Sequence, residues 1–287
     1  MLVLCTGVTL IAFAANSLLC RMALGGNLID PVAFTLIRLV GGAAILVPLA
    51  RFTAEPTPAG ASHGSWVSAL GLFAYAIAFS LAYMSLTTGM GALILFGAVQ
   101  ATMIGVGLWS GERPHPLQWL GMGAAFAGLV WLVWPGITAP DPLGAVLMGV
   151  SGMAWGVYSL RGRGALAPVA ASAGNFARSV PMAVFAGVLA GVLGIGSLRA
   201  QTSGVLLALI SGTVTSGLGY VLWYKALRGL TSTHAAVLQL LVPVIAAMAG
   251  VAFLAEAVSL RLLIASVLIL GGVGLAVLSP ARSKTEG

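Results

Sequence analysis

The sequence predicts an all-α integral membrane protein with ten transmembrane helices. Of its 287 residues, 60% are hydrophobic and only 7% are charged, whereas a water-soluble domain carries about 25% charged residues. The apolar residues gather in runs that match the roughly 20 residues a helix needs to cross a bilayer core about 30 Å thick. Outside these runs only short turns and the tail 281–287 remain, so no soluble catalytic domain is expected.

The ten runs follow one another with short connections. They cover residues 2–21, 31–51, 66–87, 90–110, 116–134, 143–162, 169–195, 203–226, 235–255 and 260–279. The first run lacks a basic leader and a convincing cleavage site, so we expect a retained helix rather than a signal peptide. The last run, LLIASVLILGGVGLAVL, carries no strongly polar side chain and is expected to face lipid or to pack against other helices.

Membrane topology explains the formal charge of +7 better than a nucleic-acid partner does. Basic residues collect on the cytoplasmic side of a bacterial-type inner membrane, and ten spans place both termini on one face. That face receives eight basic residues: Arg51, Arg113, Arg161, Arg163, Lys225, Arg228, Arg282 and Lys284. The opposite face receives three: Arg21, Arg199 and Arg261. The imbalance predicts a multi-pass inner-membrane protein with cytoplasmic N- and C-termini.

The two halves of the chain match at a nearly constant offset. The matched pairs, 140 to 144 positions apart, are Arg21 with Arg161, Arg38 with Arg178, Glu112 with Glu256 and Gly128 with Gly272. Each half then holds five spans, and because five is odd the second half must enter the membrane from the opposite side. The sequence therefore predicts a first five-helix repeat at 1–137, a second, inverted repeat at 138–280 and a cytoplasmic tail at 281–287.

Ten helices in two halves, an arginine in the second helix of each half and a glutamate after the fourth and ninth helices resemble the drug/metabolite transporter (DMT) superfamily. Within it, the pattern resembles the EamA-type branch and its YddG-like amino-acid exporters. The most similar stretch is LQLLVPVIAAMAGVAFLAEAVSL in the second half; its counterpart in the first half has Val99 in place of Pro243. The resemblance covers nearly the whole chain. It implies that helices 1, 3, 4, 6, 8 and 9 line a central cavity and that helices 5 and 10 lie at the periphery.

Arg38 and Arg178 interrupt apolar runs, each about two turns from the end of its helix. A guanidinium at such depth costs about 2.5–3.5 kcal/mol or less. We expect Arg38 to reach toward the outer face and Arg178 toward the inner face, or each to pair with backbone carbonyls. Two interpretations stay open, a structural anchor and a contact with the gate or the substrate. The anchor interpretation predicts that lysine is tolerated at Arg38.

Polar and aromatic side chains deep in the spans predict a central substrate site, because lipid offers no water to satisfy them. The predicted substrate-binding residues are Asn16, Tyr75, Phe79, Gln100, Trp155, Thr215 and Gln239. Pro243 is predicted to kink its helix and to free the carbonyl of Gln239, which suits an ammonium group. Pro181 is predicted to free the carbonyl of Ala177, which Arg178 could satisfy. Core packing of the aromatic rings and rescue of each kink by a neighbouring helix stay open as alternatives.

The acidic residues are all predicted at span ends, in loops or in the tail: Asp30, Glu55, Glu112, Asp141, Glu256 and Glu286. No carboxylate proton site is therefore expected within the membrane, and Glu112 and Glu256 are expected to end helices or to pair with arginines. The residues favour export of a small zwitterion, a neutral or aromatic amino acid, by alternating access through a central cavity. Ten spans complete such a pathway in one chain, so we expect a functional monomer in the lipid bilayer.

Three alternatives compete with amino-acid export. A transporter of phosphorylated or nucleotide-linked metabolites would use Arg38, Arg178 and Lys225 as anion sites. A cationic multidrug exporter is disfavoured by the predicted acid-free interior. An intramembrane enzyme would need a deep nucleophile and base or a metal cluster, and the three histidines and two cysteines offer no such spacing. We therefore expect neither catalytic residues nor a metal or cofactor.

Overall fold

The computed structural model describes residues 2–53, 63–109, 115–134, 139–162, 165–194, 199–227, 238–239 and 241–278. The helices are α1 (Leu2–Gly25), α2 (Pro31–Phe52), α3 (Trp66–Ala82), α4 (Thr88–Trp109), α5 (Pro116–Val133), α6 (Pro142–Gly162), α7 (Pro168–Val192), α8 (Thr202–Ile210), the π-helix η1 (Ser211–Leu218), α9 (Gly219–Leu227), α11 (Leu241–Leu254) and α12 (Leu260–Leu278). Because α8, η1 and α9 form one continuous span, the described part of the chain has ten helical spans, as predicted.

Six spans are long and apolar enough to cross a membrane: α1, α2, α4, α6, α7 and the continuous α8–η1–α9 span. The other four spans are shorter apolar helices in their described parts. Large apolar side chains stay exposed on the outside of the bundle, among them Phe126, Phe185 and Phe253. In water such a surface would be unfavourable. It is the surface that lipid covers, and the protein is a multi-pass membrane protein.

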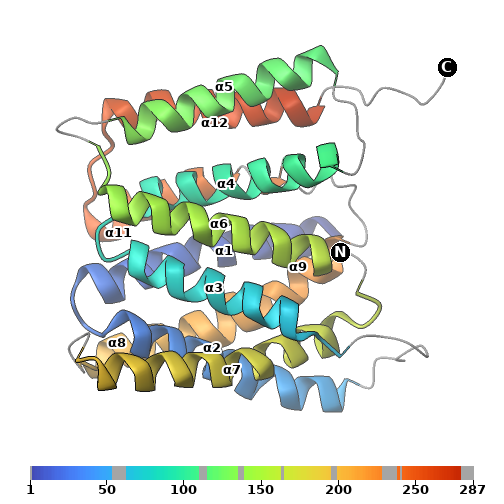
Figure 1. Ribbon diagram of the computed structural model, residues 1–287, viewed down its shortest axis with the longest axis vertical. Coiled ribbons are helices and arrows are strands. Elements are labelled where there is room, and N and C mark those ends of the chain that lie inside the picture. The colour runs from blue at the N-terminus through green and yellow to red at the C-terminus, as the bar shows by residue number, and fades with distance from the viewer. Residues whose placement is uncertain are drawn as a thin grey trace.

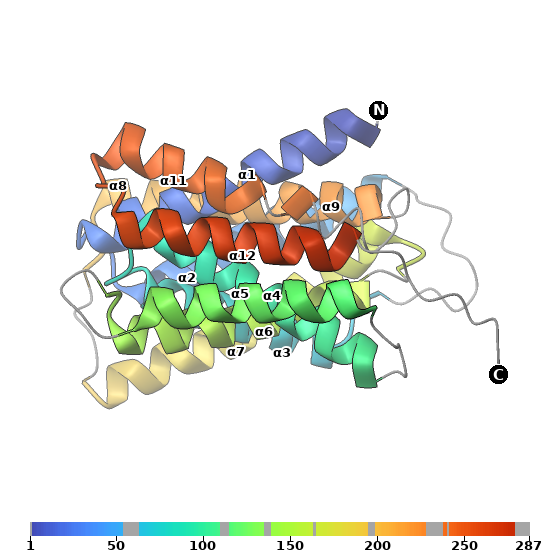
Figure 2. The ribbon, with the colours of Figure 1, turned by 90° about the horizontal axis from the view of Figure 1, so that it is seen from above.

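The helices lie side by side with nearly parallel axes (Figure 1). α5 and α12 form a pair at one edge of the bundle, and α2 and α7 lie near the opposite edge. Gly121 and Gly272 allow α5 and α12 to approach closely, because a Cβ atom on either residue would collide with the backbone of the other helix. The start of α1 and the end of α12 lie at the same end of the molecule (Figure 2). We call this end the N-terminal end.

The helix contacts follow a regular pattern. α5 packs on α12, α4 on α11 and α2 on α7, while α3 packs on α6 and α1 on α9. If each span is replaced by the corresponding span of the other half of the chain, every one of these contacts becomes a contact of the same set. The contact of α3 with α6, for example, becomes the contact of the α8–η1–α9 span with α1. Such a pattern is compatible with two repeats, but the repeat arrangement and its division at 137–138 stay predictions.

The third span is shorter than its apolar run of 66–87 predicted. α3 ends at Ala82, and the next residues form a turn in which the amides of Ser85 and Leu86 donate to the Ala82 carbonyl, at 3.2 and 3.0 Å. α4 then begins at Thr88 rather than at residue 90. The hydropathy of the sequence does not indicate this turn, because several of its residues are apolar.

Candidate functional site

Asn16 on α1 is the centre of a buried polar cluster. Its Nδ2 atom donates to the Tyr75 hydroxyl on α3 at 3.2 Å. Its Oδ1 atom accepts from the hydroxyls of Ser211 at 2.7 Å and Thr215 at 3.1 Å. A buried amide needs several partners, and here they come from two other spans, α3 and the continuous α8–η1–α9 span. The predicted site residues Asn16, Tyr75 and Thr215 are therefore in one hydrogen-bonded group.

The π-helix η1 supplies the hydroxyls of this cluster. Thr215 donates to the Ser211 carbonyl at 3.0 Å, and Thr213 donates to the Leu209 carbonyl at 2.7 Å. Hydroxyls that bond back to their own helix compete with its regular hydrogen bonds, and π segments are frequent at functional sites. Gly212 permits the close approach of η1 to α2, since a Cβ atom there would collide with the backbone of Arg38.

Arg38 is buried in the bundle, with only 1% of its surface exposed. Its Nε atom donates to Ser216 at 2.9 Å, and its Nη2 atom donates to the hydroxyls of Tyr75 and Tyr220 at 3.0 and 2.8 Å. The prediction that Arg38 reaches the outer interface or pairs with carbonyls is therefore wrong. The side chain turns inward because three hydroxyls of α3 and the η1–α9 span offer acceptors there.

Aromatic rings enclose the cluster. The ring centroid of Trp155 on α6 lies 4.9 Å from that of Tyr75 and 4.6 Å from that of Tyr220. Phe79 lies 5.3 Å from Tyr75, and Phe13 packs edge-on against Trp155 at 5.6 Å. The Arg38 guanidinium stands over the rings of Tyr75 and Phe79, 5.1 and 5.2 Å from their centroids. Cation–π contacts of this kind partly compensate a buried charge.

A small cavity lies inside this aromatic wall. Its volume is about 10 Å³, room for roughly one water molecule. The lining residues come from α1, α3, α4 and α6: Phe13, Asn16, Ser17, Tyr75, Phe79, Leu95, Phe96 and Trp155. They include four of the seven predicted site residues, and Thr215 joins them through Asn16. Gln100 and Gln239 are buried but do not line this cavity.

Arg178 lies in a different environment, close to the N-terminal end. Its Nη1 atom donates to the carbonyls of His63 and Gly174 at 2.8 and 3.0 Å. Pairing with backbone carbonyls is one of the two alternatives that the sequence analysis gave for this arginine. The partner is Gly174 rather than Ala177, although Pro181 lies inside α7 as expected. Pro243 lies in the first turn of the described part of α11, so the predicted kink at Gln239 stays a prediction.

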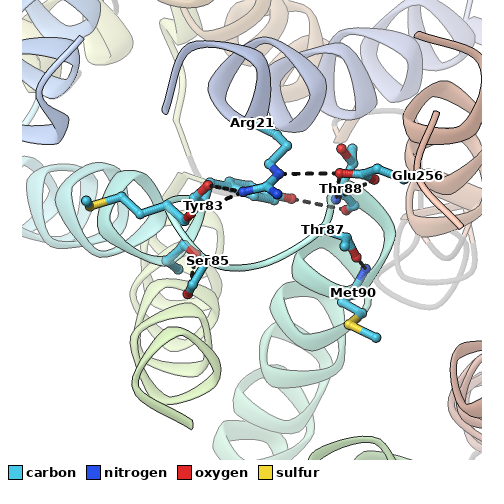
Figure 3. Close-up of polar contacts among 9 residues, drawn as sticks. Arg21, Tyr83, Ser85, Thr87, Thr88, Met90 and Glu256 are labelled. Carbon is cyan, nitrogen blue, oxygen red and sulfur yellow. Dashed lines mark hydrogen bonds and ion pairs between the residues drawn. The ribbon is translucent and has the colours of Figure 1, made fainter. Parts of the chain in front are cut away.

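A charged network holds the opposite end of the molecule together (Figure 3). Arg21 on α1 donates from Nη1 to the carbonyls of Tyr83 and Met84 at 3.1 and 3.2 Å. Its Nε atom lies 3.4 Å from Oε1 of Glu256. The same carboxylate accepts from the Thr88 amide at the start of α4, at 2.8 and 3.0 Å. Glu256 thus pairs with an arginine, as expected, and caps α4.

A backbone motif positions Glu256. α11 ends at Leu254, and Ala255 adopts a positive φ of 51°. The Glu256 amide then donates to the Gly250 carbonyl at 3.2 Å. A positive φ just after a helix end is usual for glycine, and here Ala255 adopts it. Gly250 leaves room for the carboxylate, since a Cβ atom there would collide with Oε2 of Glu256. The matching residue Glu112 lies outside the described part of the chain.

The described acidic residues all lie at helix ends. Asp30 caps α2 by accepting from the amides of Val32 and Ala33, at 2.8 and 3.3 Å. Asp141 accepts from the Gly144 amide at the start of α6, at 2.6 Å. With Glu256, these are the acids that the structure describes, so its described core contains no carboxylate.

A wider crevice opens at the N-terminal end between α2 and α7, with a volume of about 420 Å³. Its walls are Val47, Ala50, Arg51, Thr53, His63, Val169, Ala170, Ala173, Gly174 and Ala177. The crevice and the central cavity have no lining residue in common. The two hollows are therefore separate in this conformation.

Comparison with known proteins identifies the family. The EamA-like transporter family matches residues 142–278, and "Uncharacterized protein PA1977" of Pseudomonas aeruginosa is 47% identical over 288 residues, covering 99% of the chain and 97% of that relative. The chain belongs to the EamA-like transporter family. This EamA-like transporter is also 29% identical over 197 residues to "Uncharacterized transporter" of Archaeoglobus fulgidus, covering 65% of the chain and 67% of the relative.

One solved crystal structure resembles the EamA-like transporter with a TM-score of 0.63 and 22% sequence identity. The match covers 94% of this chain and 96% of the other. At this identity it shows the fold alone. The chain is thus a membrane transporter of the EamA type, in agreement with the resemblance at the level of the family.

The predicted set of site residues omitted several residues of the site, among them Phe13, Ser216 and Tyr220. Tyr220 follows Ser216 by one helical turn and both bind Arg38, so a search for hydroxyls at helical spacing opposite a buried arginine would have found them. Phe13 gave no signal, because one phenylalanine among apolar residues in a span does not indicate a cavity.

Proposed function

We propose that this transporter exports amino acids with neutral or aromatic side chains, by alternating access through the central cavity. The observation that carries the proposal is the cavity wall, which combines the Asn16 amide with the rings of Tyr75, Phe79 and Trp155. An amide and hydroxyls suit the polar groups of an amino acid, and aromatic walls suit its side chain. The absence of acids from the described core favours a zwitterion over a cation.

The two ends of the molecule support the proposal of alternating access. A cavity of about 10 Å³ cannot hold an amino acid, so the present conformation is closed around its centre and must expand to bind solute. The Arg21–Glu256 network ties α1 to the turn before α4 and would have to open on that side. The crevice beside α7 offers a route from the N-terminal end. Charge bias favours a cytoplasmic position for that end in an inner membrane.

The arrangement of cations argues against a phosphorylated substrate. Arg38 is bound to hydroxyls in the core, Arg178 to carbonyls near the N-terminal end, and Lys225 is exposed. The hydrogen bonds of Arg38 and Arg178 have no partner in common. Recognition of a phosphate dianion favours more than one cation at one point, and the described residues place a single buried arginine, Arg38, behind the cavity wall.

Counterflow in proteoliposomes tests the proposed function. Purified protein is reconstituted as a monomer, loaded with an excess of one unlabelled amino acid, and exposed to a trace of the labelled form. We expect transient accumulation of labelled phenylalanine, leucine and tryptophan above protein-free liposomes. Exchange of a sugar phosphate without exchange of any amino acid would contradict the proposal and favour the phosphorylated class.

A further inference from the structure

Two buried hydrogen-bond donors of the central site have no acceptor. The Tyr75 hydroxyl oxygen accepts from Asn16 Nδ2 at 3.2 Å and from Arg38 Nη2 at 3.0 Å, which occupy its two lone pairs, and it shares a hydrogen bond with the Tyr220 hydroxyl at 3.1 Å. Arg38 Nη1 and Trp155 Nε1 have no partner among the described residues. Ser17 Oγ, also without a partner, lines the same cavity. The site therefore presents unpartnered donors, one of them charged, to a solute.

The site also carries an uncompensated positive charge. The hydrogen bonds of Arg38 go to three neutral hydroxyls, and the described acids all lie at helix ends. Burying a guanidinium without an anion is unfavourable in a medium of low dielectric constant. An ionisable residue in a membrane span marks a functional site whose partner must be named. No described core residue offers Arg38 a negative charge, and a negatively charged group on the solute would supply one.

We infer that Arg38 and Trp155 form a carboxylate-binding subsite, which receives the carboxylate of the transported solute. This inference rests on the proposed function and narrows its substrates to monocarboxylates. A carboxylate supplies one negative charge and two oxygen atoms with about four acceptor positions. These match the one buried cation and the two unpartnered donors. A phosphate dianion would leave one negative charge without a cation.

The position of Tyr75 indicates how the subsite is filled. Arg38 does not line the cavity, but Tyr75 and Phe79, whose rings it contacts, do. The entering carboxylate replaces the Tyr75 hydroxyl as acceptor of Arg38 Nη2 and takes the unpartnered Nη1 as well. Two parallel hydrogen bonds from one guanidinium to one carboxylate are a strong and specific geometry. Trp155 Nε1, on a ring that already lines the cavity, contributes a third donor.

A set of ligands that share one aromatic side chain tests the inference on the wild-type transporter. Competition against labelled L-phenylalanine in counterflow is measured for 3-phenylpropionate, L-phenylalaninamide, phenethylamine and phenyl phosphate. We expect 3-phenylpropionate to compete at least about tenfold better than the amide or the amine, because charge-assisted hydrogen bonds are lost without the carboxylate. Competition by the amide equal to that by phenylalanine would overturn the subsite while leaving amino-acid export intact.

Two arginine variants assign the effect to Arg38. Arg38→Gln is expected to reduce the preference for 3-phenylpropionate over the amide to below about threefold, whereas the matched variant Arg178→Gln retains it. Stabilisation of the detergent-solubilised protein by each ligand gives a second readout that needs no transport. If 3-phenylpropionate stabilises the wild type but not Arg38→Gln while phenylalanine is not exchanged, the subsite stands and amino-acid export is wrong. An unchanged preference in a folded Arg38→Gln protein overturns the subsite.

Discussion

Both carboxylate oxygens of Glu256 accept from the backbone amide of Thr88, at 3.0 and 2.8 Å, although the two residues are 168 positions apart. The carboxylate stands at the N-terminus of α4, where exposed amides and the helix dipole favour a negative charge. Arg21 approaches the same carboxylate from α1. One acid therefore holds together three spans at the end of the molecule opposite the N-terminus.

Breaking this network is expected to open that end. Glu256→Gln keeps one acceptor for the Thr88 amide but loses the ion pair with Arg21. In a protein whose Cys5 and Cys20 are replaced by alanine, we expect a cysteine placed at Ser17 in the cavity wall to react several-fold faster with a membrane-impermeant thiol reagent. Asp141→Asn, a capping acid at the same end without a bond to α1, is the matched control. Equal labelling of both variants would contradict a closing role for Glu256.

Lysine substitution distinguishes the two membrane arginines. Arg38→Lys is expected to lower transport at least about tenfold, because lysine lacks the planar fork that reaches Ser216 and both tyrosine hydroxyls. Arg178→Lys is expected to stay within about twofold, since one ammonium can replace the single nitrogen that bonds two carbonyls. Initial rates in proteoliposomes, normalised to reconstituted protein, provide the comparison. Normal transport by Arg38→Lys would restore the anchor interpretation.

The contact between η1 and α2 depends on Gly212. Gly212→Ala is expected to destabilise the protein by about 1–3 kcal/mol, because the new methyl group overlaps the backbone of Arg38 and forces the helices apart. Gly149→Ala on α6, where a Cβ atom meets nothing within 4 Å, is the control and should be neutral or stabilising. Thermal unfolding in detergent measures both variants. Equal melting temperatures would show that the helices can move apart without loss.

Hydrogen bonding at the site predicts unequal effects of two amide substitutions. Asn16→Ala removes the partner of Tyr75, Ser211 and Thr215, so we expect the half-saturation concentration for every amino acid to rise about tenfold. The sequence also predicted a role for Gln100 and Gln239. Gln100 does not line the cavity, and a smaller rise is expected for Gln100→Ala. A larger effect of Gln100→Ala than of Asn16→Ala would indicate that the binding site lies farther along α4, close to Gln100.

Much of the fold could be predicted because membrane spans obey a simple rule of length and polarity. The start of α3 at Trp66 and of α5 at Pro116 agrees with the predicted runs. The turn after Ala82 could not be predicted, since it depends on Arg21, a residue of another span, which binds the carbonyls of Tyr83 and Met84. Local hydropathy contains no information about such a contact.

The site was partly predictable for a related reason. Deep polar and aromatic residues are rare in lipid, so Asn16, Tyr75 and Trp155 were recognisable from composition and position alone. The direction of Arg38 was not, because distance from a helix end does not say whether a long side chain turns outward or inward. That direction is set by hydroxyls 37 to 182 positions away in the sequence.

The most direct test of the central claim, that the cavity beside Trp155 binds the solute, is the order of amino-acid preference in counterflow. Half-saturation concentrations are measured for alanine, leucine, phenylalanine and tryptophan in the wild type and in Trp155→Ala, with the lipid-exposed Trp119→Ala as control. An apolar pocket separates substrates by about 1–3 kcal/mol per methylene, so removing the indole should improve tryptophan relative to alanine by about tenfold, while Trp119→Ala keeps the wild-type order. An unchanged order in a folded, transporting Trp155→Ala protein would contradict the site.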